Sequence, residues 1–171
     1  MKIYHYFKLV VFIAFAVLVF VLREELLMNL QYLVGSLMLL YGLENVILIS
    51  IKERTQARKS IWFIFGYSEV LLGLVTLIAI RNYVAVCVMW GVWSILRESL
   101  EIYEITSGEI KGIPAIISGI ESAVAIVFSV LLIITPGEHH AKTHIYLLIV
   151  ELIITSFIPV LKELLNRKRN E

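Results

Sequence analysis

The stretch WGVWSILRESLEIYE, residues 90–104, carries Arg97 and Glu98 side by side within an otherwise apolar run. The chain around it has 171 residues, of which 60% are hydrophobic. Soluble domains are about 45–50% apolar, so a chain of this length could not cover so much apolar surface in water. The composition therefore predicts an all-α integral membrane protein with the lipid bilayer as its first partner.

Six segments have the length and composition of membrane-spanning helices. A helix needs about 20 predominantly apolar residues to cross a bilayer. The segments are Tyr4–Leu22, Met28–Ile51, Ile61–Ile80, Tyr83–Glu104, Ile113–Thr135 and His144–Leu165. Short polar breaks separate them, which predicts a bundle of six transmembrane helices in a single domain, residues 1–171.

The distribution of Lys and Arg predicts the orientation. If the N-terminus is cytoplasmic, twelve of these residues fall inside and three, Arg23, Arg81 and Lys142, fall outside. Cytoplasmic loops of membrane proteins carry such an excess, so both termini are predicted to be cytoplasmic. The net charge of +1 gives no field that would attract nucleic acid. A second copy of the chain or another membrane protein could be a partner.

The chain divides into three units of similar layout, approximately 3–59, 60–112 and 113–171. Each contains an apolar helix, a short outer turn and a return helix. Three pairs of glycines seven residues apart support this division: Gly35 and Gly42, Gly66 and Gly73, Gly112 and Gly119. A seven-residue step keeps small residues on one face, where transmembrane helices approach closely. The pattern predicts three repeated helix hairpins packed at these glycines.

A family resemblance rests on glycines and tryptophans at Gly66, Gly73, Trp90, Gly91, Trp93 and Gly119. With these residues and its paired helices, the chain resembles the HdeD-like family of small six-span bacterial inner-membrane proteins. The resemblance implies a bacterial plasma membrane, a link to acid or envelope stress, and no catalytic residues. The chain departs from the family pattern in having more intramembrane Glu, including Glu98 where glycine is common.

A layer of charged residues is predicted at one depth in the membrane. Four carboxylates lie six to eight residues from the cytoplasmic ends of their helices, about 9–12 Å below the edge of the apolar core. They are Glu44, Glu69, Glu98 and Glu121, with Arg97 at the same depth. Glu151 is expected in the outer half, away from this layer. Because a charge facing lipid costs at least about 2.5–3.5 kcal/mol, the layer should face the bundle interior.

Two interpretations of this layer stay open. Arg97 can neutralise one carboxylate, or two if its guanidinium is forked between them, which leaves others to be protonated, share protons or bind a cation. In the first interpretation these groups only hold helices together by hydrogen bonds, assisted by Ser68, Ser94, Ser99, Ser118 and Ser122. In the second they form a proton, ion or solute site that opens toward the cytoplasm.

Three histidines, His139, His140 and His144, are placed in the longest outer loop. Imidazole titrates near pH 6.5, so they could sense external acid, or they could belong to an ordinary solvated loop. The adjacent pair lacks the helical spacing of zinc ligands, and no metal is predicted. The sequence contains no P-loop, paired cysteines, HExxH or Gly-x-Ser-x-Gly motif, so we expect no catalytic residue, no enzyme activity and no cofactor.

These observations leave three functions. The first is a non-enzymatic protein of HdeD type, associated with acid or envelope stress, whose Glu layer handles protons or a small cation. The second is a small secondary transporter or channel for a cationic or amine-bearing solute. The third is a structural accessory subunit.

Overall fold

The computed structural model describes residues 2–51, 56–108 and 110–169, and side chains within 6–47, 63–108 and 110–157. The helices in these residues are α1 (Lys2–Val21), α2 (Arg23–Met28), α3 (Leu30–Ile51), α4 (Gln56–Ile78), α5 (Tyr83–Thr106), α6 (Ile113–Ile134) and α7 (Glu138–Arg169). No strand occurs in the described ranges. The prediction of an all-helical chain is confirmed.

The short helix α2 lies where the sequence predicted a plain turn. The backbone N–H of Leu26 donates to the carbonyl of Leu22 at 2.8 Å and links α2 to the end of α1. Glu24 and Glu25 lie in the first turn of α2, where negative charge interacts favourably with the helix dipole. The chain therefore passes from α1 toward α3 through a helical turn.

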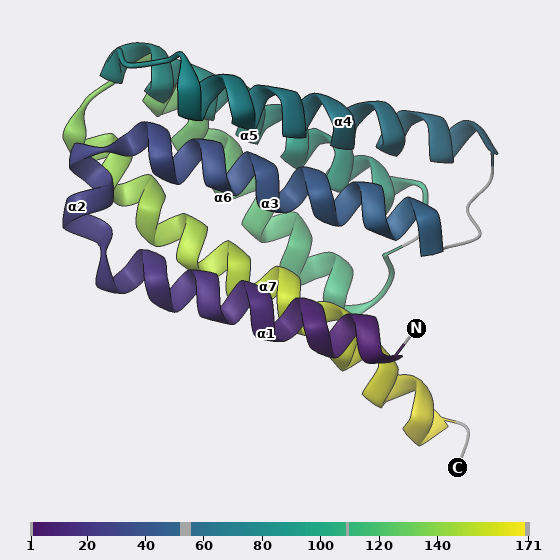
Figure 1. Ribbon diagram of the computed structural model, residues 1–171. Coiled ribbons are helices and arrows are strands. Elements are labelled where there is room, and N and C mark those ends of the chain that lie inside the picture. Colours follow the sequence, from purple (N-terminus) through teal and green to yellow (C-terminus); the bar gives the residue numbers. More distant parts are fainter. Residues whose placement is uncertain (1, 52–55, 109, 170–171) are drawn as a thin grey trace. The chain divides into compact units, whose positions relative to one another are not determined.

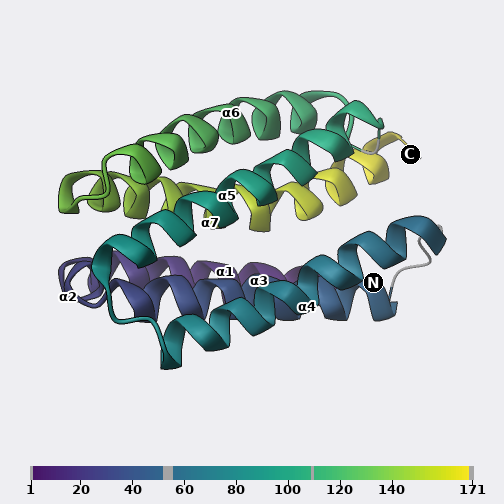
Figure 2. The same cartoon turned by 90° about the horizontal axis from the view of Figure 1, so that it is seen from above.

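The chain forms two compact units, which are described separately. The second unit, Met28–Val86, consists of α3, α4 and the first residues of α5. Figures 1 and 2 both draw α3 and α4 side by side. The two helices meet at paired glycines: a Cβ on Gly42 would lie 2.8 Å from the Gly66 carbonyl oxygen, and one on Gly73 would lie 2.8 Å from that of Gly35. The predicted close approach at these four glycines is confirmed.

The first unit comprises the residues up to Leu27 and those from Cys87 onward. Within it α7 packs against both α1 and α6. The helix α5 approaches α6 at Gly91, where a Cβ would lie 2.7 Å from the Ser129 carbonyl oxygen and 2.6 Å from a side-chain carbon of Ile133. This contact lets the polar residues of α5 reach those of α6.

The prediction of close packing at Gly112 and Gly119 is wrong. Gly112 precedes α6 and has a φ of 69°. A Cβ added to Gly112 would have no neighbour within 4 Å. A Cβ on Gly119 would make only an ordinary contact, 3.8 Å from Ile105. Gly112 is required for its left-handed backbone, which only glycine adopts without cost, and not for helix packing.

Three helices among the described residues are long and apolar enough to cross a membrane: Leu30–Ile47, Tyr83–Thr106 and Ile113–Ile134. The apolar stretches Tyr6–Val21 and Phe63–Ile78 are shorter. On α6 the exposed face consists of large aliphatic residues, among them Ile116, Ile120 and Val127. A face of this kind is suited to contact with lipid. The three long apolar helices indicate a membrane protein.

Candidate cation site

Three carboxylates converge in the first unit. Glu98 and Glu101 on α5 and Glu121 on α6 each offer one oxygen, and these oxygens all lie within 4.8 Å of one another. We call these three residues the carboxylate cluster. Oxygen ligands on opposite sides of a calcium ion are separated by about 4.6–5.2 Å, twice the metal–oxygen distance. The spacing therefore suits a bound cation, although the sequence predicted no metal site.

The helical repeat explains how α5 contributes two members of the cluster. Glu98 and Glu101 are three residues apart, so they lie on neighbouring positions of one helix face. Trp90 and Trp93 are buried on the same helix, which fixes the orientation of α5 in the unit. The approach of α5 to α6 at Gly91 allows Glu121 to meet this face.

Hydrogen bonding within the cluster is incomplete. The Glu98 side chain is 1% exposed, and its Oε2 atom has no hydrogen-bond partner. Both carboxylate oxygens of Glu121 are buried and also lack one. Buried polar groups without partners are costly, and each such group in a folded protein calls for an explanation. A bound proton or cation would satisfy these oxygens.

Two of the five serines donate hydrogen bonds within their own helices. Ser68 and Ser99 donate to the carbonyls of Phe65 and Ile95 on their own helices, each at 2.7 Å. The Ser118 and Ser122 hydroxyls are buried on α6 and have no partner of acceptable geometry, although Ser122 lies beside Glu98. Ser122 therefore belongs to the immediate surroundings of the carboxylate cluster.

Arg97 lies next to a residue that the sequence placed elsewhere. Its Nε atom is 3.5 Å from Oε1 of Glu151 on α7, and both side chains are largely buried. The guanidinium also lies 5.9 Å from the centre of the Trp93 ring, within range of a cation–π interaction. The expectation that Glu151 lies apart from the charged residues is wrong. The helix α7 begins at Glu138 and not at His144, so Glu151 is its fourteenth residue. Arg97 is the fifteenth residue of α5 and so lies at a similar distance from the start of its helix.

Glu44 and Glu69 belong to the second unit. Both are buried, and Glu69 accepts a hydrogen bond of 2.7 Å from the Asn45 side-chain nitrogen across the α3–α4 contact. This bond is short and its partners are buried, as expected of a structural interaction between membrane helices. The structure brings Glu98 and Glu121 together and pairs Glu69 with Asn45. A common layer that includes Glu44 and Glu69 stays a prediction.

The three histidines lie on a helix, so their placement in a loop is wrong. Pro136 and Gly137 end the preceding connection, and the Ala141 N–H donates to the Gly137 carbonyl at 3.0 Å as α7 begins. His139 is exposed, and His140 is half-buried. His144 is buried, with its ring edge-on to Trp90 at a centroid distance of 4.4 Å. External acid sensing by these residues stays a prediction.

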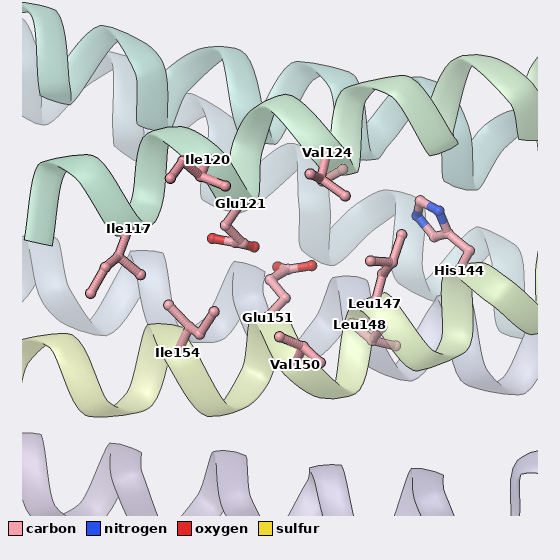
Figure 3. A pocket seen from close by; sticks show the side chains of 11 residues that line it. Ile117, Ile120, Glu121, Val124, His144, Leu147, Leu148, Val150, Glu151 and Ile154 are labelled. Atoms are coloured by element: carbon pink, nitrogen blue, oxygen red, sulfur yellow. The ribbon is translucent and has the colours of Figure 1, made fainter.

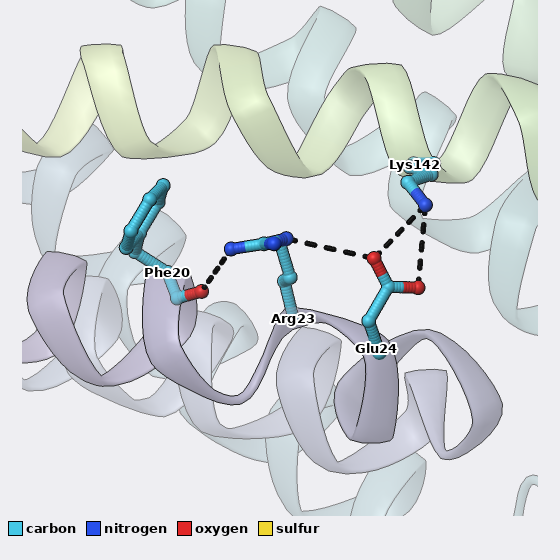
Figure 4. A network of polar contacts seen from close by, with 4 residues as sticks. All are labelled: Phe20, Arg23, Glu24 and Lys142. Carbon is cyan, nitrogen blue, oxygen red and sulfur yellow. Dashed lines mark hydrogen bonds and ion pairs between the residues drawn. The ribbon is translucent and has the colours of Figure 1, made fainter.

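An exposed ion pair joins α2 to α7 in the same unit. The Lys142 ammonium contacts both Glu24 oxygens, at 2.9 and 3.2 Å, and Arg23 lies 3.5 Å from the same carboxylate (Figure 4). The hydrogen bond from Lys142 lowers the pKa of Glu24 below its usual 4.5. The same bond raises the pKa of Lys142 above its usual 10.5. Lys142 and Glu24 therefore both stay charged at neutral pH.

Two members of the site escaped prediction. Glu101 could have been found, because it lies three residues from Glu98 and four from Arg97 and so shares their helix face. Glu151 could be placed only once the beginning of α7 was known.

Comparisons of the chain with known protein families, with curated proteins and with solved structures found no match. Function is therefore inferred from the chemistry of the site.

Proposed function

We propose that this chain is a non-enzymatic membrane protein that binds protons or a small cation at the carboxylate cluster. One observation carries the proposal. Three carboxylates of α5 and α6 lie within reach of a single ion, and the buried oxygens of Glu98 and Glu121 have no hydrogen-bond partner. Ionisable groups inside membrane helices are expensive and are functional candidates by default.

The charge balance around the cluster favours a cation. Arg97 is the cationic side chain that acts on both Glu98 and Glu121, and it also lies against Glu151. One guanidinium cannot fully neutralise the cluster and Glu151 together. The excess negative charge would be balanced by protons or by a bound cation, because isolated buried charges are too costly to persist.

The wider setting belongs to the same proposal. We infer six spans arranged as three repeated hairpins, with both termini cytoplasmic, in the inner membrane of a bacterium. The six apolar segments, the excess of Lys and Arg on one side and the HdeD-like glycines and tryptophans support this assignment. A role in acid or envelope stress follows from the resemblance.

A second candidate function is transport of a cationic or amine-bearing solute. It is favoured by a groove between α6 and α7 that reaches Glu121 and Glu151. A purely structural accessory role is better suited to the Asn45–Glu69 pair, whose hydrogen bond is complete, than to the carboxylate cluster.

Ion flux in proteoliposomes tests the proposal. The purified protein is reconstituted with a trapped pH-sensitive dye in one arm and a trapped calcium indicator in the other, and a gradient is imposed. We expect flux in at least one arm, reduced at least tenfold by Glu98→Gln. Glu104→Gln is a control on the same helix outside the cluster. An absence of flux in both arms, or equal flux in the wild type and Glu98→Gln, would contradict the proposal.

A further inference from the structure

The helices α6 and α7 enclose a groove of about 330 Å³ (Figure 3). Eight of its eleven lining residues are aliphatic, and the other three are Glu121, His144 and Glu151. Pockets that hold small organic ligands have volumes of about 300–1,000 Å³ and are mostly apolar with a few polar groups. A metal ion alone would fill only a small part of this space, since even a water molecule takes up about 30 Å³.

The polar groups of the groove are concentrated at its middle. Glu121 points from α6 and Glu151 from α7 toward each other, with His144 farther along the groove (Figure 3). Oε1 of Glu151 lies 3.5 Å from Nε of Arg97 and forms an ion pair with it. In contrast, neither oxygen of Glu121 has a hydrogen-bond partner. An oxygen of Glu98 lies within 4.8 Å of one of Glu121, and Glu98 is 1% exposed and has its own unpartnered oxygen. The middle of the groove therefore offers carboxyl oxygens that a positively charged ligand would satisfy.

The rim of the groove is apolar and exposed. Ile120 is 63% exposed and Val124 38% exposed on α6, and Val150 is 49% exposed on α7. In a membrane helix, exposed aliphatic residues of this kind contact lipid. A molecule could reach the groove sideways from the bilayer if its own body were apolar. The apolar rim, the volume and the central carboxylates together define an amphiphilic ligand with one positive charge.

We propose that the groove between α6 and α7 binds an amphiphilic cation, a protonated amine with an alkyl or aryl tail. The ammonium group contacts Glu121, and the tail lies along Ile120, Val124 and Val150. This inference goes beyond the proposed function, although Glu121 is common to the groove and the carboxylate cluster. Protons or a small cation at the cluster and the amine in the groove then compete for Glu121.

Binding of radiolabelled dodecylamine to the protein in phosphatidylcholine nanodiscs tests this proposal, with empty nanodiscs subtracted. We expect at least tenfold weaker binding in Glu121→Gln and in Val124→Phe, which narrows the groove. Val127→Phe is the matched control, because Val127 is 58% exposed on the same helix and does not line the groove. Unlabelled dodecanol, which lacks the charge, and methylamine, which lacks the tail, should each compete at least tenfold less well than dodecylamine.

Three results would overturn the inference. Equal competition by dodecanol would show a groove that holds only acyl chains, and equal competition by methylamine would show that the tail plays no part. Unchanged binding in Val124→Phe would place the amine elsewhere, even if Glu121→Gln failed to fold. The ion-flux measurement distinguishes the two proposals. If flux depends on Glu98 and any of these three results is also obtained, only the proposal of amine binding in the groove is overturned. Amine binding that depends on Glu121, with flux indifferent to Glu98→Gln, would overturn only the proposed function.

Discussion

The α3–α4 contact and the α5–α6–α7 site both bury glutamates among apolar helices, but they treat them differently. In the first, the helices touch at paired glycines, and the buried Glu69 carboxylate accepts a hydrogen bond from Asn45. In the second, Oε2 of Glu98 and both carboxyl oxygens of Glu121 are buried and have no hydrogen-bond partner. Buried polar groups that satisfy each other hold a structure together, whereas those without partners are candidates for binding a proton or a ligand.

The largest expected effect is a difference in ion flux between variants of Glu121 and Glu69. Glu121→Gln removes the charge that is common to the cluster and the groove, and we expect ion flux to fall at least tenfold, which corresponds to about 1.4 kcal/mol or more. Glu69→Gln should leave flux within about twofold, because a neutral side chain at Glu69 does not alter the cluster. Proteoliposome flux measures both variants. Equal losses would erase the distinction between the two regions.

The next effect concerns helix packing. Gly42→Ala places a Cβ 2.8 Å from the Gly66 carbonyl oxygen, where backbone must move. We expect the free energy of unfolding in detergent micelles to fall by about 1–3 kcal/mol, as in other overpacked cores. Gly119→Ala is the control, since its Cβ would have an ordinary neighbour at 3.8 Å. Tolerance of Gly42→Ala equal to that of Gly119→Ala would show that the paired glycines do not hold α3 against α4.

A smaller effect compares polar side chains. Asn45→Leu removes the donor to Glu69, and we expect a loss of about 1–2 kcal/mol in the free energy of unfolding, because Glu69 keeps other interactions. Ser122→Ala removes a buried hydroxyl that lies beside Glu98 without a hydrogen bond of acceptable geometry, so its effect should be smaller than that of Asn45→Leu. Chemical unfolding of both variants in the same micelles gives the comparison. A costly Ser122→Ala would mean that this serine is already structurally engaged.

The smallest effect belongs to the exposed Glu24–Lys142 pair. Since Lys142 lowers the pKa of Glu24, the ionised pair stabilises the fold at neutral pH, and this contribution is lost as pH falls through the lowered pKa. It is also lost as pH rises through the raised pKa of Lys142. In Lys142→Met, stability should depend slightly less on pH in the acid range than in the wild type. The change is small because exposed ion pairs contribute little.

Thermal unfolding as a function of pH measures this change. Lys111→Met removes an exposed lysine outside the pair and is the control. An acid limb of Lys142→Met that superimposes on that of the wild type would show that the pair does not contribute to stability.

Much of the helical architecture could be predicted from the sequence, because apolar segments separated by short polar breaks specify helices directly. The glycine spacing predicted the α3–α4 contact but misled at Gly112 and Gly119, since spacing cannot distinguish a packing glycine from one needed for backbone conformation. Nothing in the sequence periodicity singled out Gly91, which makes the α5–α6 contact.

The candidate site was predicted in part. Glu98 and Glu121 were identified from their depth, but Glu151, the partner of Arg97, was not. The reason is that α7 begins at Glu138, before the predicted start at His144, so Glu151 lies farther along the helix than predicted. Hydrogen-bond satisfaction also lies beyond sequence reasoning: the same serine–glutamate neighbours occur at Ser68–Glu69 and Glu121–Ser122. Only the side-chain contacts distinguish the completed pair of α3–α4 from the open cluster.

Infrared difference spectroscopy of the carboxyl groups tests the central distinction most directly. The spectrum of the reconstituted protein is recorded before and after a pH step, for the wild type, Glu121→Gln and Glu69→Gln. We predict that the pH-dependent change in the band of protonated carboxyl groups is smaller in Glu121→Gln than in the wild type and is unchanged in Glu69→Gln. A change that is equal in Glu121→Gln and the wild type, but smaller in Glu69→Gln, would contradict this distinction.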